Sequence, residues 1–285
     1  MQLHVVDAFT DRPFTGNPAG VCLLPAGDWP EDAWLSLVAA EVNHPETAFA
    51  LPLADDPEAD WEIRWFTPLV EANLCGHATL ATAHVLRTVR GLRGTARFRS
   101  RRHGVLLAHT EEDGSITLDF PSSPALDVPV PEGLLAALTP ERARESLGAT
   151  KPQAVLRADP LGDLLVVLPD EAAVRSLAPD LDAVAALTRR EGLRGLIATA
   201  RTADPGQGYD FVSRFFAPAS GIPEDPVTGS AHTVLAPYWS ALIGRNRLTG
   251  LQASPRSGLV RTAVHGDRVH LTGDAVTVLE GTLHG

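Results

Sequence analysis

The strongest constraint on the fold is an internal repeat: three segments of the first half return in the second half, in the same order and at a nearly constant offset. The matching pairs are RWFTP at 64–68 with RFFAP at 214–218, CGHATLATAHVL at 75–86 with TGSAHTVLAPYW at 228–239, and HGVLLAHTEEDGSITL at 103–118 with SGLVRTAVHGDRVHL at 257–271. Two generic β-loop-α units could match by coincidence, but three ordered matches favour a duplicated α/β chain. Such a duplication is expected to place its two related helices face to face across a cleft, where binding sites usually form.

The residue pattern of each half predicts strands arranged around helices. In the first half, β-rich segments predict strands at LHVVDAF, GVCLL, ETAFALPL and WEIRWFT. One helix is predicted from Pro30 to His44-Pro45, because the residue before a proline is disfavoured in the α conformation. Another is predicted from Gly76 to Gly91. In the second half, helices are predicted near 132–147, near 170–190 and after Thr228-Gly229, with strands at AVLRA, DLLVVLP, GLIATA and YDFVSRFFA.

A linker is predicted between the halves, where four prolines crowd a short stretch at positions 121, 124, 129 and 131. A length of 285 residues also fits two domains better than one. We therefore predict an N-terminal half at 1–121 and a C-terminal half at 132–285. This division leaves open a crossover of the last strand of the chain into the N-terminal half.

Charge and cysteine content narrow the class of protein. With 24 Lys+Arg against 35 Asp+Glu, the net charge is −11, which argues against a nucleic-acid or anionic-membrane partner. The opening segment carries Asp7 and lacks the apolar region of a secretory signal. Two cysteines, Cys22 and Cys75, are too few for a disulfide framework and suit a reducing compartment. These features predict a cytoplasmic protein without a membrane span.

The two glycines that open the repeated helices, Gly76 and Gly229, are candidate ligand-binding positions. A helix N-terminus presents unpaired N–H groups and a partial positive charge, so it can bind an anion. Glycine also lets a ligand approach the backbone closely, because it has no Cβ atom. Each glycine alone could be a simple turn residue, but the duplicated pair favours binding of a substrate carboxylate.

Candidate reactive side chains lie beside these two glycines. In the second half, Asp225, Thr228 and Ser230 could serve as ordinary helix caps or take part in proton transfer. In the first half, Cys75 could be a buried small hydrophobe. His77 is placed in the first helical turn, where the helix dipole opposes protonation, so a neutral imidazole that passes protons is favoured.

Glu46, in the segment NHPETAF, is the candidate general base or acid. It follows a helix stop and precedes an apolar strand, so partial desolvation would raise its pKa toward the range that acid–base catalysis needs. A solvated acid at a strand edge is an equally good explanation of the pattern alone.

Other chemistries have little support in the residues. The GxGxxG, Walker and HExxH motifs are absent from the sequence, and Ser230 does not sit in a GxSxG nucleophile elbow. Cys75 and His77 have no second pair of ligands at a zinc-finger spacing, so no metal site is predicted.

Several motifs together resemble the PhzF family of phenazine-biosynthesis-like proteins, which have a diaminopimelate epimerase-like fold. The segments that carry the resemblance are DAFTDRPFTGNPAGV at 7–21, NHPETAF at 43–49, FTPLVEANLCGHATLATAHVL at 66–86, FFAPASGIPEDPVTGSAH at 215–232 and GDAVTVLEGTL at 273–283. The resemblance implies two pseudo-symmetric halves, each a sheet wrapped around a central helix. It also implies a homodimer and no cofactor.

The resemblance implies a reaction and a set of residues. The type reaction is the isomerisation of trans-2,3-dihydro-3-hydroxyanthranilate by proton transfer, with Glu46 as the acid/base. His77, Asp225 and Ser230 are implied to surround the substrate and hold or relay protons, and Gly76 and Gly229 to bind its carboxylate. Asn17, Cys75 and Thr228 complete the expected substrate-binding set.

Two alternatives stay open from the sequence. Racemases of this fold class use two cysteines, but the paired positions here are Cys75 and Thr228, and an unaided threonine hydroxyl is too weak a base to replace a thiolate. A one-sided epimerase or dehydratase of a cyclic amino acid using Cys75 is therefore the first alternative. A non-catalytic small-molecule-binding protein is the second.

Overall fold

The sequence duplication appears in the computed structural model, which describes residues 1–139 and 151–284, as two units with the same order of strand pairings. Unit 1 comprises Met1–Asp119 and His270–Gly285, and unit 2 comprises Phe120–Val269. Compared with the predicted halves of 1–121 and 132–285, the last strand lies in unit 1 and the proline-rich stretch at 121–131 lies entirely in unit 2. The chain therefore leaves unit 1 within one strand and returns to it within another.

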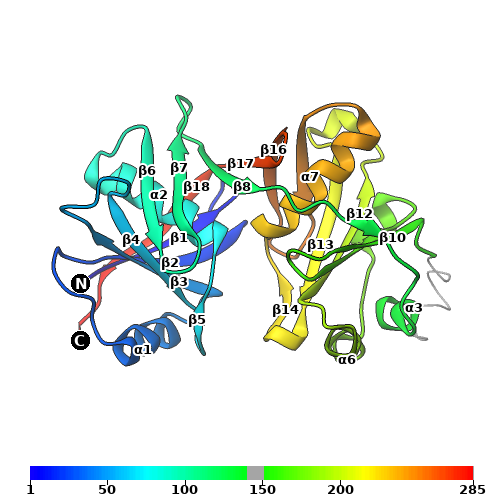
Figure 1. Ribbon diagram of the computed structural model, residues 1–285, viewed down its shortest axis with the longest axis horizontal. Helices are drawn as coiled ribbons and strands as arrows, with labels where there is room; N and C mark the ends of the chain where they lie inside the picture. Colours follow the sequence, from blue (N-terminus) through cyan, green and yellow to red (C-terminus); the bar gives the residue numbers. More distant parts are fainter. Residues whose placement is uncertain (140–150, 285) are drawn as a thin grey trace. The chain divides into compact units, whose positions relative to one another are not determined.

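Unit 1 is a mixed sheet. Its elements are β1 (Gln2–Ala8), β2 (Asn17–Leu23), α1 (Asp32–Val42), β3 (Glu46–Pro52), β4 (Trp61–Phe66), β5 (Glu71–Ala72), α2 (Gly76–Arg90), β6 (Thr95–Ser100), β7 (Gly104–Thr110), most of β8 (Ile116–Pro121) and β18 (Ala275–Thr282). β1 pairs antiparallel with β2, β2 parallel with β3, and β3 antiparallel with β4. β4 then pairs parallel with β6, which continues antiparallel through β7 to β8. β18 pairs antiparallel with β1, so both ends of the chain lie side by side (Figure 1).

Unit 2 repeats this plan. Its elements are β9 (Leu126–Asp127), α3 (Leu134–Leu138), β10 (Ala154–Ala158), β11 (Asp163–Val167), α5 (Glu171–Arg175), α6 (Leu181–Glu191), β12 (Gly195–Arg201), β13 (Phe211–Ala217), β14 (Ile222–Asp225), α7 (Gly229–Ile243), β15 (Arg247–Gln252), β16 (Gly258–His265) and the start of β17 (Arg268–Gly273). β10 to β13 pair in the same directions as β1 to β4, and β13 pairs parallel with β15 as β4 does with β6. The predicted α/β fold class, with two related halves built around Gly-opened helices, is therefore confirmed.

The predicted elements are present with small shifts at their ends. The helix expected near 132–147 begins as α3, and its residues 140–147 lie outside the described residues. The region expected to be helical near 170–190 contains two helices, α5 and α6, of which α6 is the longer. Within the described ranges, the structure contains no helix with the length and hydropathy needed to cross a membrane.

Two apolar layers hold the sheet of unit 1. On one face, Cys22, Phe49 and Phe66 pack with Leu35 of α1. On the other face, α2 packs against β1, β2 and β3 and is buried from His77 to Leu86. A helix can be buried on all sides when its residues are mostly small or apolar, and α2 is rich in alanine.

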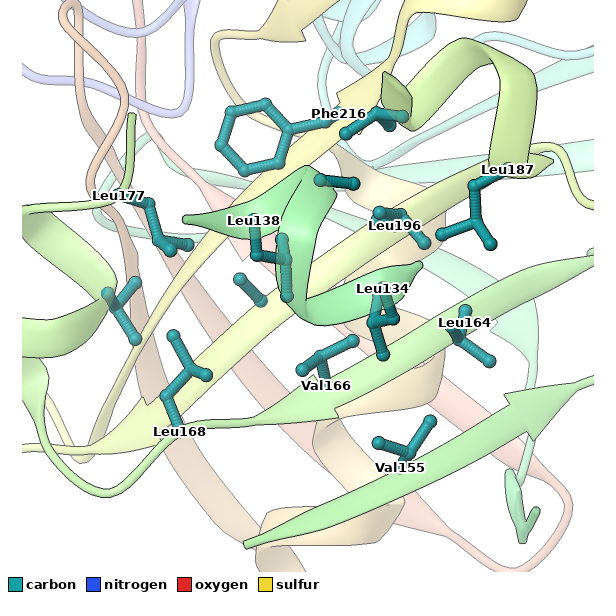
Figure 2. Packing of buried hydrophobic residues seen from close by; sticks show 14 of the residues in the cluster. Leu134, Leu138, Val155, Leu164, Val166, Leu168, Leu177, Leu187, Leu196 and Phe216 are labelled. Atoms are coloured by element: carbon teal, nitrogen blue, oxygen red, sulfur yellow. The ribbon is translucent and has the colours of Figure 1, made fainter. Parts of the chain in front are cut away.

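Unit 2 has a hydrophobic cluster on each face of its sheet. Figure 2 shows the first, in which Leu134 and Leu138 of α3 meet Leu164 and Val166 of β11. The second lies against α7 and includes the stacked rings of Phe211 and Trp239. The buried faces of the two sheets thus place both central helices, α2 and α7, in apolar surroundings.

An ion pair with a largely buried arginine is repeated in the two units. Arg64 donates from Nε and Nη2 to the two carboxylate oxygens of Glu71 at 2.7 and 2.8 Å, and Arg214 binds Glu224 at the same two distances. Each guanidinium also lies 4.9 Å from the ring of the phenylalanine two residues later in its strand. These contacts explain why the RWFTP and RFFAP motifs share their arginine and their second aromatic residue.

Helix α7 contains a proline in its interior, Pro237, which has no N–H group to bond the carbonyl of Thr233. The backbone N–H of Ser123 donates to that carbonyl at 3.1 Å. The segment after β8 therefore satisfies the hydrogen bond that the proline leaves open and fastens the chain to α7.

Acid is expected to destabilise the protein partly through His232, which is fully buried on α7 and donates from Nδ1 to the Thr228 carbonyl at 2.8 Å. Burial lowers the pKa of His232 to about 4, and the hydrogen bond to Thr228 opposes this shift. An unfolded histidine has a pKa near ~6.5. Between these two values the unfolded chain takes up a proton that the folded protein refuses, so stability falls as the pH falls, by up to about 1.4 kcal/mol per pH unit.

Urea unfolding of the wild type and of His232→Asn across this pH window measures the effect. The variant should lose less stability on acidification than the wild type. The same substitution at the exposed His265 is the matched control and should keep the wild-type slope. Equal slopes for wild type and His232→Asn would show that His232 is not responsible.

Candidate functional site

Four of the predicted site residues of unit 1 come together at one edge of its sheet. Asn17 and Glu46 are the first residues of β2 and β3, and these strands are parallel neighbours with Ala19 opposite Glu46. Parallel strands begin at the same edge of a sheet, so the two polar side chains start from one place. Cys75 is the N-cap of α2, and His77 is the second residue of that helix. We call Asn17, Glu46, Cys75 and His77 the Glu46 cluster.

A tight turn delivers Asn17 to this edge. Gly16 has φ +68, and a Cβ atom added there would lie 2.3 Å from the carbonyl oxygen of Ala8. Only glycine fits such a position without strain. The GNP segment was predicted to be the turn itself, but only Gly16 lies in the turn, and Asn17 and Pro18 already begin β2.

His77 is the centre of the Glu46 cluster. Its Nε2 lies 3.3 Å from Glu46 Oε2, and its Nδ1 lies 3.2 Å from Asn17 Nδ2. Cys75 Sγ lies 3.4 Å from Nδ1 and 3.8 Å from Nε2. The side chains of His77 and Glu46 are 7% and 13% exposed, so the cluster is shielded but Glu46 still reaches solvent.

Burial decides the protonation state of His77. It lowers the pKa of the imidazole to about 3, so His77 is neutral at physiological pH. The amide nitrogen of Asn17 can only donate, so Nδ1 accepts and the single ring proton resides on Nε2. That proton points to the Glu46 carboxylate, 3.3 Å away.

In unit 2, Asp225 and Thr228 form a second polar group. Thr228 donates from its hydroxyl to Asp225 Oδ2 at 2.6 Å. The fully buried Gln252 accepts from the Thr228 N–H at 2.8 Å and donates to the Asp225 carbonyl at 2.7 Å. Gln252 was not among the predicted residues, yet it fixes the backbone on both sides of the loop that leads into α7.

Ser230, the residue of α7 that matches His77 of α2, is held by an arginine. Arg194 donates from Nη1 to Ser230 Oγ at 3.0 Å and makes a two-pronged contact with the fully buried Asp163. Burial raises the pKa of Asp163, and the hydrogen bond from Arg194 opposes that rise. Sequence reasoning missed both Arg194 and Asp163, which lie far from Ser230 in the chain and in no recognised motif.

The starts of α2 and α7 are equivalent in detail. The N-caps Cys75 and Thr228 both have extended backbones, and neither side chain makes a capping hydrogen bond to its helix. Gly76 and Gly229 follow as the first helical residues. The side chains of the two N-caps are therefore not consumed by capping, which the sequence alone left open for Thr228.

A separate polar cavity of about 110 Å³ lies beside β4 and β5. Its lining includes Arg64, Glu71 and Arg101, and none of the four residues of the Glu46 cluster. Arg64 and Glu71 in this lining are paired with each other.

The duplicated sheets, each with a Gly-opened central helix, define the class of diaminopimelate epimerase-like proteins. A probable proline racemase from Agrobacterium radiobacter shares this fold with a TM-score of 0.61 at 13% identity, over 99% of this chain and 92% of that one. Residues 6–281 match the model of the PhzC-PhzF family of phenazine biosynthesis-like proteins, and this chain belongs to that family.

Individual relatives are similar to this chain over its full length. An uncharacterized isomerase from Pseudomonas aeruginosa is 44% identical over 287 residues, covering 100% of this chain and 99% of its own. The crystal structure of a PhzF-family phenazine biosynthesis protein from Enterococcus faecalis superposes with a TM-score of 0.86 at 36% identity, covering 99% of this chain and 98% of that one. The resemblance stated from the motifs is thereby confirmed.

Proposed function

We propose that the protein is a cofactor-independent isomerase that moves a proton on a small cyclic carboxylic or amino acid, similar to trans-2,3-dihydro-3-hydroxyanthranilate isomerase. The observation that carries the proposal is the Glu46 carboxylate, partly buried and 3.3 Å from the Nε2 atom of a neutral His77. The name of the Pseudomonas aeruginosa relative, an isomerase, supports the reaction class.

The proposed reaction needs a single group that acts first as a general base and then as a general acid. Glu46 takes a proton from a carbon of the substrate, and the electron pair of the broken C–H bond shifts into the conjugated system of the substrate. The same carboxyl then returns its proton to a different carbon, so the product is an isomer and no atom is gained or lost. Before the transfer, the Nε2–H group of His77 donates a hydrogen bond to the Glu46 carboxylate and stabilises its negative charge. This stabilisation weakens when Glu46 is protonated.

Further residues are proposed to assist. The helix N-termini at Gly76 and Gly229 present backbone N–H groups that suit a carboxylate. Asp225, whose carboxylate accepts from Thr228, and Ser230, whose hydroxyl accepts from Arg194, are proposed to hold or relay protons. Asn17 is proposed to act through His77, by fixing its ring tautomer.

The test is proton exchange in D₂O. The purified protein is incubated with trans-2,3-dihydro-3-hydroxyanthranilate, and the substrate signals are followed by NMR. Loss of substrate or uptake of deuterium at carbon supports the proposed reaction. With no change, this substrate is withdrawn, and the same exchange assay is run with other small cyclic amino and hydroxy acids. Tight binding of such acids without any exchange would point instead to a binding protein.

One observation favours a second candidate function, a one-sided epimerase or dehydratase that uses Cys75. The thiol sulfur lies 3.4 Å from His77 Nδ1, which is close enough for an imidazole to accept the thiol proton. Alkylation by iodoacetamide discriminates between the two candidates. Inactivation that the substrate prevents, together with full activity of a Glu46→Gln variant, would transfer the base role from Glu46 to Cys75.

We also propose that the protein works as a homodimer in the cytoplasm, with small molecules rather than nucleic acid or membrane as its ligands. The net charge of −11 supports the exclusion of polyanionic partners. Light scattering during size-exclusion chromatography should give twice the chain mass of 30.3 kDa, and a single chain mass would contradict the dimer.

A further inference from the structure

The Glu46 cluster contains three kinds of metal-binding group at one place. One carboxylate oxygen of Glu46, Cys75 Sγ and a ring nitrogen of His77 all lie within 4.8 Å of one another. Across residues 1–139 and 151–284, no other group of three histidine, cysteine or acidic side chains comes this close. The sequence offered only two ligands, Cys75 and His77, because Glu46 is distant in the chain.

Two of the three ligand separations are close to those around a tetrahedral zinc ion. Typical bond lengths to zinc place a sulfur and a nitrogen ligand about 3.5 Å apart, and a nitrogen and an oxygen ligand about 3.4 Å apart. The observed values are 3.8 Å between Cys75 Sγ and His77 Nε2, and 3.3 Å between His77 Nε2 and Glu46 Oε2. Cys75 Sγ lies nearer to His77 Nδ1, at 3.4 Å, so the Cys75 side chain must turn toward Nε2 before all three ligand atoms face one ion.

The charge and the surroundings also suit zinc. A thiolate and a carboxylate together neutralise Zn²⁺, so the complex adds no net charge to a shielded site. Thiolate with imidazole selects zinc over magnesium or calcium, which prefer oxygen ligands. Asn17 contacts the Nδ1 side of His77, and its amide oxygen can accept from Nδ1–H when Nε2 binds a metal.

We propose that Glu46, Cys75 and His77 bind one Zn²⁺ ion and that the bound ion switches the protein off. On binding, the thiol of Cys75 releases its proton to solvent, sulfur, nitrogen and oxygen each donate a lone pair to zinc, and no electrons are transferred. The inhibition rests on the proposed function: a Glu46 carboxylate that is bound to zinc cannot accept a proton from a substrate carbon. The fourth position of the ion stays open to water, as in sites with three protein ligands.

The binding step is tested without any substrate. Untagged protein is treated with EDTA, desalted and titrated with Co²⁺, whose complexes with thiolate and imidazole ligands absorb visibly, and then with Zn²⁺ as competitor. We expect one ion per chain and a sulfur-to-cobalt charge-transfer band that Zn²⁺ removes. Cys75→Ala should lose the band and bind Zn²⁺ at least about 100-fold more weakly, since even an outer-shell partner is worth 10- to 100-fold.

The chain offers a matched control, because its other cysteine, Cys22, is buried in β2 and packs against α1 away from the cluster. Cys22→Ala should keep the band and the affinity. Thermal melts of both variants check that they are folded, and His77→Gln serves as a second ligand variant should Cys75→Ala unfold. Absence of the band in the wild type, or its survival in both ligand variants, would overturn the site.

Inhibition is then measured as deuterium exchange with and without ZnSO₄. Exchange that falls by at least tenfold and returns with EDTA supports the switch, and unchanged exchange at saturating zinc overturns it. Zinc binding by a protein that shows no exchange with any substrate would uphold the site and remove the proposed function, so the two failures are distinguishable.

Discussion

The Glu46→Gln variant should retain its fold and lose proton exchange by about 10²- to 10⁴-fold, the range typical of a general acid–base group. Glutamine has the same shape and can still accept the hydrogen bond from His77 Nε2, which lies 3.3 Å from Glu46 Oε2. It cannot bind a proton taken from carbon. The rate of deuterium uptake in D₂O measures the effect, and binding of carboxylate ligands should change little because the removed charge belongs to the base.

The same substitution at Glu41 is the matched control. Glu41 is exposed on α1, outside the Glu46 cluster, and Glu41→Gln should exchange protons at the wild-type rate. A Glu46→Gln protein with more than about one tenth of wild-type exchange would remove Glu46 from the role of base. An equal loss in both variants would point to a general effect of lowering the negative charge.

Arg194→Met should cause the largest loss of stability among single changes in the polar groups of unit 2. Asp163 is fully buried, and Arg194 binds both of its carboxylate oxygens. Removing one partner of a buried pair leaves an uncompensated charge. We expect a cost of about 3 kcal/mol, the lower end of the range for such pairs, because the Arg194 side chain is itself 37% exposed and part of its contribution is screened.

The pH dependence of this loss identifies its cause. Burial alone raises the pKa of Asp163, and the variant lacks the Arg194 hydrogen bond that opposes the rise. The folded variant therefore holds a proton that the unfolded chain releases, so its stability falls as the pH rises. Urea unfolding should show a smaller penalty near about pH 5 than near about pH 8.

Arg157→Met on the neighbouring strand β10 is the control for Arg194→Met. Arg157 pairs at 2.7 Å with Asp159, whose side chain is largely exposed, and a surface pair of this kind contributes about 0–1 kcal/mol. Similar losses of unfolding free energy in both variants would mean that the Arg194–Asp163 pair contributes no more to stability than a surface pair.

Much of the fold could be read from the sequence because the repeat carries structural information at matched positions. Arg64 and Arg214 recur since each binds a carboxylate and lies over a phenylalanine. Gly76 and Gly229 recur since each opens a central helix. The sequence left open whether β18 crosses over into unit 1. Alternating apolar residues predict a strand, but they do not predict which strand it pairs with.

The candidate site was predictable where its residues lie in motifs. Cys75 and His77 are two residues apart, and Glu46 begins a strand that the sequence predicts. Their mutual contacts were not predictable, because strand register and the packing of α2 bring distant residues together. Arg194 shows the limit: an arginine before a strand is usually solvated, and only the buried Asp163 reveals its use.

The position of β18 has a consequence for folding during synthesis. β1 needs β18 as its partner, and nearly the whole chain lies between the two strands. During synthesis, all of Phe120–Val269 leaves the ribosome before β18 does. Unit 2 can therefore fold first. Until β18 is synthesised, the edge of β1 that pairs with β18 is exposed to other chains. The Glu46 cluster lies in the sheet that β18 completes, so in a nascent chain this sheet should be fully paired only after β18 has been synthesised.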